Sequence, residues 1–199
     1  MQYLPEGKKI FADSHPGWIC YVDEHTGHAY AKTFDLSEGA EYPDQDAHVE
    51  AWINSEPLLY LGVEVVSPIV ELAPGGRYTF TEDWWAARVQ GPVLQVNQAD
   101  AIAQRLRLEG DFLSATCGVF YEGKARLVFI GGDGKVLGES QEHVVTPLET
   151  FILREKTKVP QGAVRAELRV SDPGGVPIGV LDAVELQGKP NLGEKLWPN

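Results

Sequence analysis

The sequence predicts an all-β protein built of antiparallel β-sandwich units. Its 199 residues include 21 glycines and 13 prolines, which are spread along the chain as turn residues and not gathered in one linker. Between them lie short segments in which apolar and polar residues alternate, the period of a half-buried strand. Long helical patterns are nearly absent. Because this length suits two small β-domains, we expect one unit over residues 1–93 and a second over 94–199.

The first unit begins with a predicted hairpin, in which strands 18–22 and 28–34 are joined by the turn 23–27. The later segments are the acidic loop 37–46, the strands 48–54, 58–66, 69–72 and 77–89, and the turn 73–76. Near the end of this unit, Tyr78 and Phe80 alternate with threonines, which predicts a strand with one packed side and one wet side.

The second unit follows a connection at 90–100, and the segment 100–108 fits a short helix or a strand nearly equally well. Its further predicted strands are 112–121, 125–131, 135–145, 150–156, 163–172 and 177–186. The segments ARLVFIGGDGKVLG and AELRVSDPGGVPIG share a strand, glycine turn and strand. They predict two hairpins of one antiparallel sandwich.

Composition excludes several classes of function. The 29 acidic and 17 basic residues give a net charge of −12, which disfavours nucleic acid and anionic membranes as partners. No run of about 18 apolar residues and no signal-peptide order is present, so the expected location is cytoplasmic by default, or extracellular if the natural N-terminus is missing. Cys20 and Cys117 lie in apolar stretches and are predicted to be buried thiols, with no disulfide framework or zinc site.

The candidate ligand-binding residues lie in the stretch 48–66. If the turn 54–57 pairs its two strands, the period of two places six polar or aromatic side chains on one face. These are His48, Glu50, Trp52 and Asn54 from the first strand, and Tyr60 and Glu64 from the second. The opposite face carries apolar residues: Val49, Ala51, Ile53, Leu59, Leu61, Val63 and Val65.

Such a polar face suits a small sugar or an oligosaccharide. An aromatic ring stacks on the C–H face of a pyranose, while carboxylates and amides bind its hydroxyl groups. The alternative is a solvated outer sheet face in which a neighbouring loop covers Trp52.

The run from AYAKTFD through EYPDQDAHVEAWINSEPLLYLGVEVVSPIVELAPGGRYTFTEDWW also resembles a known family. It is similar to the C-terminal half of the galactose mutarotase-like supersandwich, especially an uncharacterised DUF4380-type branch. The resemblance covers roughly residues 16–90, and its most specific pieces are VEAWINSEPLLYL and SPIVELAPGGRYTF. It implies that residues 94–199 are an accessory β-sandwich, a kind of module that binds sugar or packs against its neighbour.

The resemblance also implies what a catalytic version would need. In mutarotases a late glutamate acts as general base and a histidine as general acid. Glu64 best matches that glutamate, with Glu50 as its rival, whereas the family's histidine and arginine come from an N-terminal half that has no counterpart in this sequence. His48 could substitute as the acid if it lies close to Glu64, but we expect no complete acid–base pair in the chain alone.

Other constellations are weaker. Trp84 and Trp85 are adjacent, so in a strand they face opposite sides. One is expected in the core, and the other is a candidate stacking platform for a ligand or part of the contact between the two units. His25 and His28 flank a turn without a third ligand, and we expect no metal site and no cofactor. The acidic loop has five carboxylates without EF-hand spacing, which favours a solvated loop and leaves calcium binding undecided. They are Asp35, Glu38, Glu41, Asp44 and Asp46.

Three functions follow as hypotheses. The first is a non-catalytic carbohydrate-binding protein. The second is an aldose 1-epimerase-like isomerase whose site is completed by a partner chain. The third is a structural module, a homodimer or a partner complex joined through exposed sheet edges.

Overall fold

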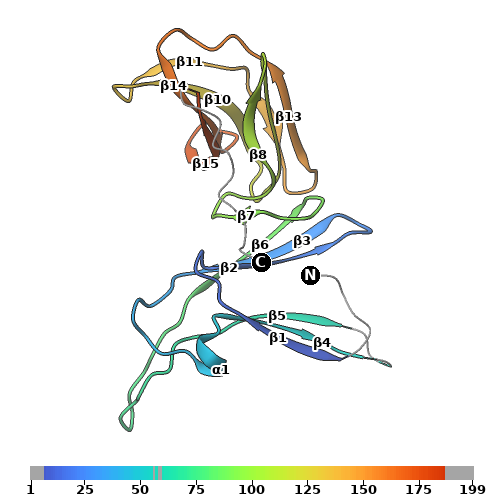
Figure 1. Ribbon diagram of the computed structural model, residues 1–199, viewed down its shortest axis with the longest axis vertical. Coiled ribbons are helices and arrows are strands. Elements are labelled where there is room, and N and C mark those ends of the chain that lie inside the picture. Colours follow the sequence, from blue (N-terminus) through green and yellow to red (C-terminus); the bar gives the residue numbers. More distant parts are fainter. Residues whose placement is uncertain (1–6, 56, 58–59, 187–199) are drawn as a thin grey trace, which may run out of the picture.

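The chain is nearly all β, as its sequence predicts, and its sheets are antiparallel. The computed structural model describes residues 7–55, 57 and 60–186. The molecule has four sheets, of which two follow one another along its long axis and two lie side by side at one end (Figure 1). We name them sheets A to D. All strands of sheets A and B precede residue 93, and all strands of sheets C and D follow it.

Sheet A is three-stranded, with the order β1-β4-β5. Its strands are β1 (Lys8–Ala12), β4 (Val49–Ile53) and β5 (Leu61–Val65). The predicted pairing of the two segments within 48–66 is therefore confirmed. β1 was not predicted, because its five residues include two lysines and its alternation is short. Residues 56, 58 and 59, including the Leu59 expected on the apolar face, lie outside the described part of the chain.

Sheet B is also three-stranded, with the order β2-β3-β6. It consists of β2 (Trp18–Asp23), β3 (His28–Phe34) and β6 (Glu82–Arg88). The first predicted hairpin is thus confirmed. The acidic loop contains the short helix α1 (Pro43–Asp46), in which Asp44, Gln45 and Asp46 have positive φ angles.

The predicted strand at 69–72 is wrong, and the strand predicted at 77–89 is confirmed only over 82–88, as β6. Residues 66–81 contain no strand, and they form an extended excursion around a turn in which the Gly76 amide donates to the Ala73 carbonyl. The alternation of Tyr78 and Phe80 satisfies the local requirement for a strand, but no neighbouring strand bonds to it. Instead, Phe80 lies 6.4 Å from the Phe34 ring, and Tyr78 is exposed.

Sheets C and D form the C-terminal sandwich. Sheet C, with the order β13-β9-β8-β7, contains β7 (Gln95–Val96), β8 (Asp100–Glu109), β9 (Phe112–Val119) and β13 (Phe151–Lys156). Sheet D, with the order β11-β10-β14-β15, contains β10 (Gly123–Gly131), β11 (Val136–Glu139), β14 (Ala163–Ser171) and β15 (Pro177–Glu185), and β12 (His143–Val145) also pairs with β10. The ambiguous segment 100–108 is a strand, and the two glycine-turn hairpins share sheet D. The single strand predicted at 135–145 is divided into β11 and β12.

Two core clusters hold these layers together. The larger one fills the space between sheets C and D and includes Leu113, Leu127 and Leu168, together with the buried thiol of Cys117. The smaller one lies between sheet B and the β7–β8 end of sheet C, and it is built around small residues such as Ala31. Sheet B therefore contacts the C-terminal sandwich through a core that crosses residue 93.

Candidate functional site

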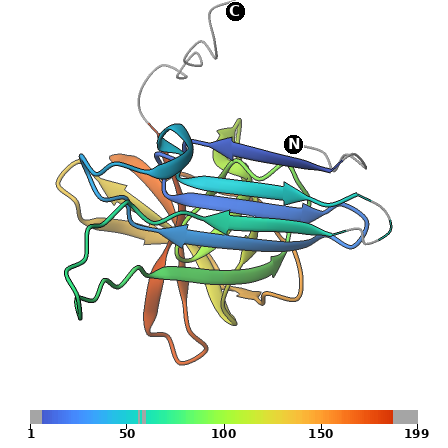
Figure 2. The same ribbon diagram turned by 90° about the horizontal axis from the view of Figure 1, so that it is seen from below.

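The outer face of sheet A carries most of the predicted site residues. In the register, Glu50 lies opposite Glu64 and Trp52 lies opposite Gly62. The Asn54 amide extends the ladder by donating to the Tyr60 carbonyl. Because directly opposed residues share a face, the shared face predicted from the sequence is confirmed. Figure 2 looks onto this face, with β4 in cyan and β5 in teal.

Gly62 creates an opening between the two residues that best suit a sugar. A side chain at position 62 would begin 3.8 Å from the Trp52 Cβ and 3.6 Å from the Glu64 Oε1. Trp52 and Glu64 thus flank a position that has no side chain. Trp52 is 36% exposed, and Glu64 and Tyr60 are also exposed. A planar ligand on Trp52 would have a hydrogen-bond acceptor beside it.

Strand β1 adds two residues that sequence reasoning missed. Lys9 lies opposite Trp52, and Phe11 lies opposite Glu50, on the same outer face. The Lys9 Nζ is 2.5 Å from the Glu50 Oε2 and 5.1 Å from the centre of the Phe11 ring. The hydrogen bond to Glu50 raises the pKa of Lys9, and the charges of Glu50, Glu64 and Asp44 act in the same direction. Glu50, which lies next to Lys9 and Phe11, is buried, so it is less accessible to a ligand than Glu64.

His48 is a buried part of the fold. Its Nδ1 accepts a hydrogen bond of 3.2 Å from the Ser14 amide, and its ring lies edge-on to Tyr42, with 4.6 Å between the centroids. Among the described residues, no hydrogen bond joins His48 to Glu64. Glu64 is exposed and His48 is covered, so this geometry does not provide the mutually placed base and acid that epimerisation needs.

The two adjacent tryptophans face opposite sides of sheet B, as predicted. Trp85 faces the smaller core, where it stacks on Phe120 with a centroid distance of 5.1 Å and donates from Nε1 to the Thr33 hydroxyl. Trp84 is 64% exposed on the other face. Neither of them lies on sheet A, so the structure does not join them to the face that carries Trp52.

Trp84 nevertheless has a fixed surrounding. Its Nε1 donates to the Glu82 Oε1 over 2.7 Å, the Lys32 ammonium lies 4.6 Å from its ring centre, and Tyr30 packs edge-on. Lys32 also pairs with Glu82 at 3.2 Å. These contacts explain the position of an exposed indole without any ligand.

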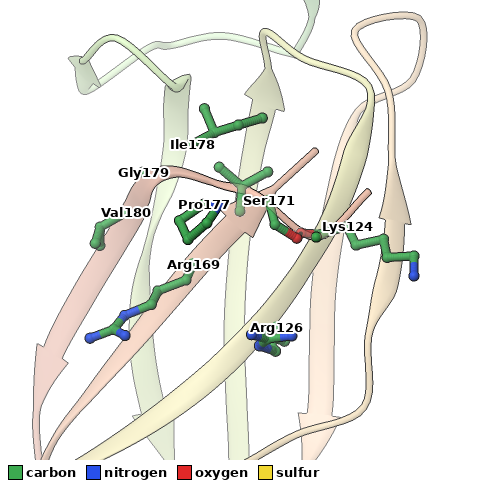
Figure 3. A pocket seen from close by; sticks show the side chains of 10 residues that line it. Lys124, Arg126, Arg169, Ser171, Pro177, Ile178, Gly179 and Val180 are labelled. Atoms are coloured by element: carbon green, nitrogen blue, oxygen red, sulfur yellow. Dashed lines mark hydrogen bonds between the residues drawn. The ribbon is translucent and has the colours of Figure 1, made fainter. Parts of the chain in front are cut away.

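A basic hollow lies on the outer face of sheet D (Figure 3). Its lining includes Lys124, Arg126 and Arg169, beside Ser171 and Pro177. Each basic side chain already has an acidic partner: Lys124 pairs with Glu142, Arg126 with Glu139 and Glu142, and Arg169 with Glu167. The hollow is therefore a network of exposed ion pairs, in which an anion would have to displace a carboxylate.

The remaining polar clusters have structural partners. The Thr26 hydroxyl contacts His28 Nδ1 at 2.9 Å, and Arg88 Nε donates to His28 Nε2. In the acidic loop the Asp46 carboxylate accepts from the Tyr42 amide. Within the described residues, no three His, Cys, Asp or Glu side chains are grouped so that they could hold a metal ion. No helix in that part of the chain is long and apolar enough to cross a membrane.

Comparison with known proteins adds no relative. No protein-family model, curated protein or solved structure matches this chain. The resemblance to the mutarotase-like supersandwich therefore stays a prediction from the sequence, and the functional argument depends on the geometry of the sheet faces and edges.

Proposed function

We propose that this protein is a non-catalytic carbohydrate-binding protein whose binding surface is the outer face of sheet A. The proposal is supported above all by Gly62, which places no side chain between two exposed residues of one sheet face, Trp52 and Glu64. A pyranose stacked on Trp52 would donate hydroxyl hydrogen bonds to Glu64.

Neighbouring groups indicate the class of sugar. Directly before β5, the exposed Tyr60 adds a second aromatic ring to this face, and its carbonyl accepts from the Asn54 amide. The carboxylates of Glu50, Glu64 and Asp44 all act on the Lys9 ammonium at this site. Because an excess of carboxylates repels anions, the surface favours neutral hexoses over uronic or sialic acids.

Calorimetric titration with neutral and acidic mono- and oligosaccharides tests this proposal. We expect heat with neutral oligosaccharides, and at least a tenfold weaker affinity in Trp52→Ala, which corresponds to about 1.4 kcal/mol. Gly62→Val is the sharper variant. Its Cβ would meet only ordinary contact distances, and valine is favoured in strands, so we expect the variant to fold while its side chain fills the space beside Trp52.

The matched control is Phe112→Ala, since Phe112 is also 36% exposed but lies on sheet C. This control should bind like the unmodified protein. The proposal is wrong if no saccharide produces heat, or if Trp52→Ala and Phe112→Ala change the affinity equally.

A further inference from the structure

A cleft of about 530 Å³ lies between sheet A and strand β2, on the side of sheet A opposite the proposed sugar-binding face. Leu61 and Val63 of β5 line one wall. Val93 lines another part, next to Gly91, whose Cα substituent would begin 3.8 Å from the Val22 Cβ. The whole length of β2 borders the cleft.

Part of the surface that β2 presents to this cleft is its main chain. The side chains of Trp18, Cys20 and Val22 pack into the smaller core, although the same residues line the cleft. Burial raises the pKa of the Cys20 thiol to about 12, in agreement with its position in the core. β2 is an edge strand, with β3 on one side only.

The hydrogen bonds show which groups of β2 point away from β3. The Trp18 amide donates to the Ser14 hydroxyl oxygen over 3.1 Å, and the Trp18 carbonyl accepts from the same hydroxyl over 2.6 Å. The preceding Gly17 carbonyl instead accepts from the amide of Phe34, the last residue of β3. Because bonded and outward positions alternate in an antiparallel strand, the amides and carbonyls of Cys20 and Val22 also point outward.

Those groups have no partner within the described part of the chain. The main-chain hydrogen bonds outside the ladders do not include the amide or carbonyl of Cys20 or Val22, and β2 pairs with no strand other than β3 there. Two outward donor and acceptor pairs, about 7 Å apart, therefore border a cleft with apolar walls. This is the arrangement that an added strand requires.

We propose that this cleft binds an extended peptide segment of another polypeptide, which adds as a strand to the free edge of β2. The peptide main chain pairs with Cys20 and Val22. Its side chains alternate between the wall formed by Leu61 and Val63 and the wall formed by Val93. The residues that face Leu61 and Val63, which are every second residue of the peptide, are therefore apolar.

Charge indicates the remaining feature of the peptide. The cleft lining contains Asp23 and Glu24 at one end, and neither lysine nor arginine occurs among the described lining residues. The Thr26 hydroxyl and the His25 amide donate to Asp23 and lower the pKa of its carboxyl, which stays ionised. The bound segment carries a lysine or arginine at this end.

A displayed library of random octapeptides tests the proposal with the full-length protein. We expect enriched peptides with alternate apolar residues and one terminal basic residue. Methylating the amide nitrogens that face β2 should weaken binding at least tenfold, whereas methylating the alternate set should leave it unchanged. Bound peptide should also slow hydrogen exchange at the Cys20 and Val22 amides at least tenfold, as followed by NMR.

Protein variants locate the site. Val22→Pro removes one outward amide, and proline is tolerated on edge strands, while Val22→Thr keeps that amide and serves as its control. Leu61→Lys changes the wall without altering β2, so it decides the matter if Val22→Pro fails to fold. The proposal is overturned if no sequence is enriched, if both methylation patterns weaken binding equally, or if Leu61→Lys leaves the affinity unchanged.

Discussion

The two halves of the molecule use their strands differently. In the C-terminal half, sheets C and D close over a core of large side chains, including Leu127, Phe129 and Leu168, which are almost fully buried. In the N-terminal half, sheet B shares a smaller core with the β7–β8 end of sheet C, and β3 contributes only the small side chains of Ala29 and Ala31 to it.

This difference separates stability from recognition. Small sheets with few large buried side chains leave a sheet face and a strand edge open, and both proposed binding sites lie there. The closed sandwich supplies most of the buried apolar surface, which is the main source of stability. We therefore expect substitutions in the sandwich and at the junction to change stability, and substitutions on the outer face of sheet A to change binding.

The largest expected effect concerns Asp100, at the start of β8. Its carboxyl is fully buried, and its Oδ1 accepts a 2.7 Å hydrogen bond from Asn97, while no hydrogen-bond partner for Oδ2 is found in the described chain. Burial raises the pKa of Asp100 to about 7, and the charge of Asp182 acts in the same direction. The nearby thiol of Cys117 opposes this rise, as does the bond from Asn97.

The contribution of Asp100 to the free energy of unfolding depends on pH. Between about pH 4 and pH 7 the folded protein keeps a proton on Asp100 that the unfolded chain has lost, so its contribution to stability falls as the pH rises. Relative to the unmodified protein, Asp100→Asn should become more stable over this window by about 4 kcal/mol. Urea unfolding at pH 4, 5.5 and 7 measures this difference.

Glu64→Gln is the control in the open half, because Glu64 is exposed. It should change the free energy of unfolding by less than about 0.5 kcal/mol at each pH. A difference between Asp100→Asn and the unmodified protein that is the same at every pH would contradict the assignment.

The second prediction compares the two adjacent tryptophans. Trp85 joins the halves by stacking on Phe120, whereas Trp84 is 64% exposed. Trp85→Ala should lower the free energy of unfolding by about 3 kcal/mol, and Trp84→Ala by less than about 1 kcal/mol. Denaturant unfolding followed by circular dichroism gives both values. Equal losses would show that the stack on Phe120 does not hold the halves together.

Much of this architecture could be predicted because alternation is a local signal. It places Glu50, Trp52 and Glu64 on a common face once their strands pair, and it places Trp84 and Trp85 on opposite faces. It failed at Tyr78, where the pattern of a strand is present but no neighbouring strand bonds to it.

The alternation of residues along a strand could not predict which residues of the candidate site are accessible to a ligand. Glu50 and His48 are on the predicted face, yet Lys9 pairs with the first and Ser14 and Tyr42 contact the second. In the sequence, Lys9 and Ser14 lie 34 or more positions from the residues that they contact. The cleft beside β2 likewise depends on how sheets A and B pack, which no short segment specifies.

The smallest expected effect is at the junction itself, at Gly118 of β9. A side chain there would begin 2.8 Å from the Arg88 carbonyl and 3.0 Å from the Val89 Cβ, so the end of β6 would have to move. Gly118→Ala should therefore lower the free energy of unfolding by about 2 kcal/mol. Gly179→Ala is the matched control inside the sandwich, where the nearest atom is the Ala99 Cβ at 3.6 Å, an ordinary contact. If thermal unfolding shows equal losses for the two variants, β9 and β6 are not packed as closely as the junction requires.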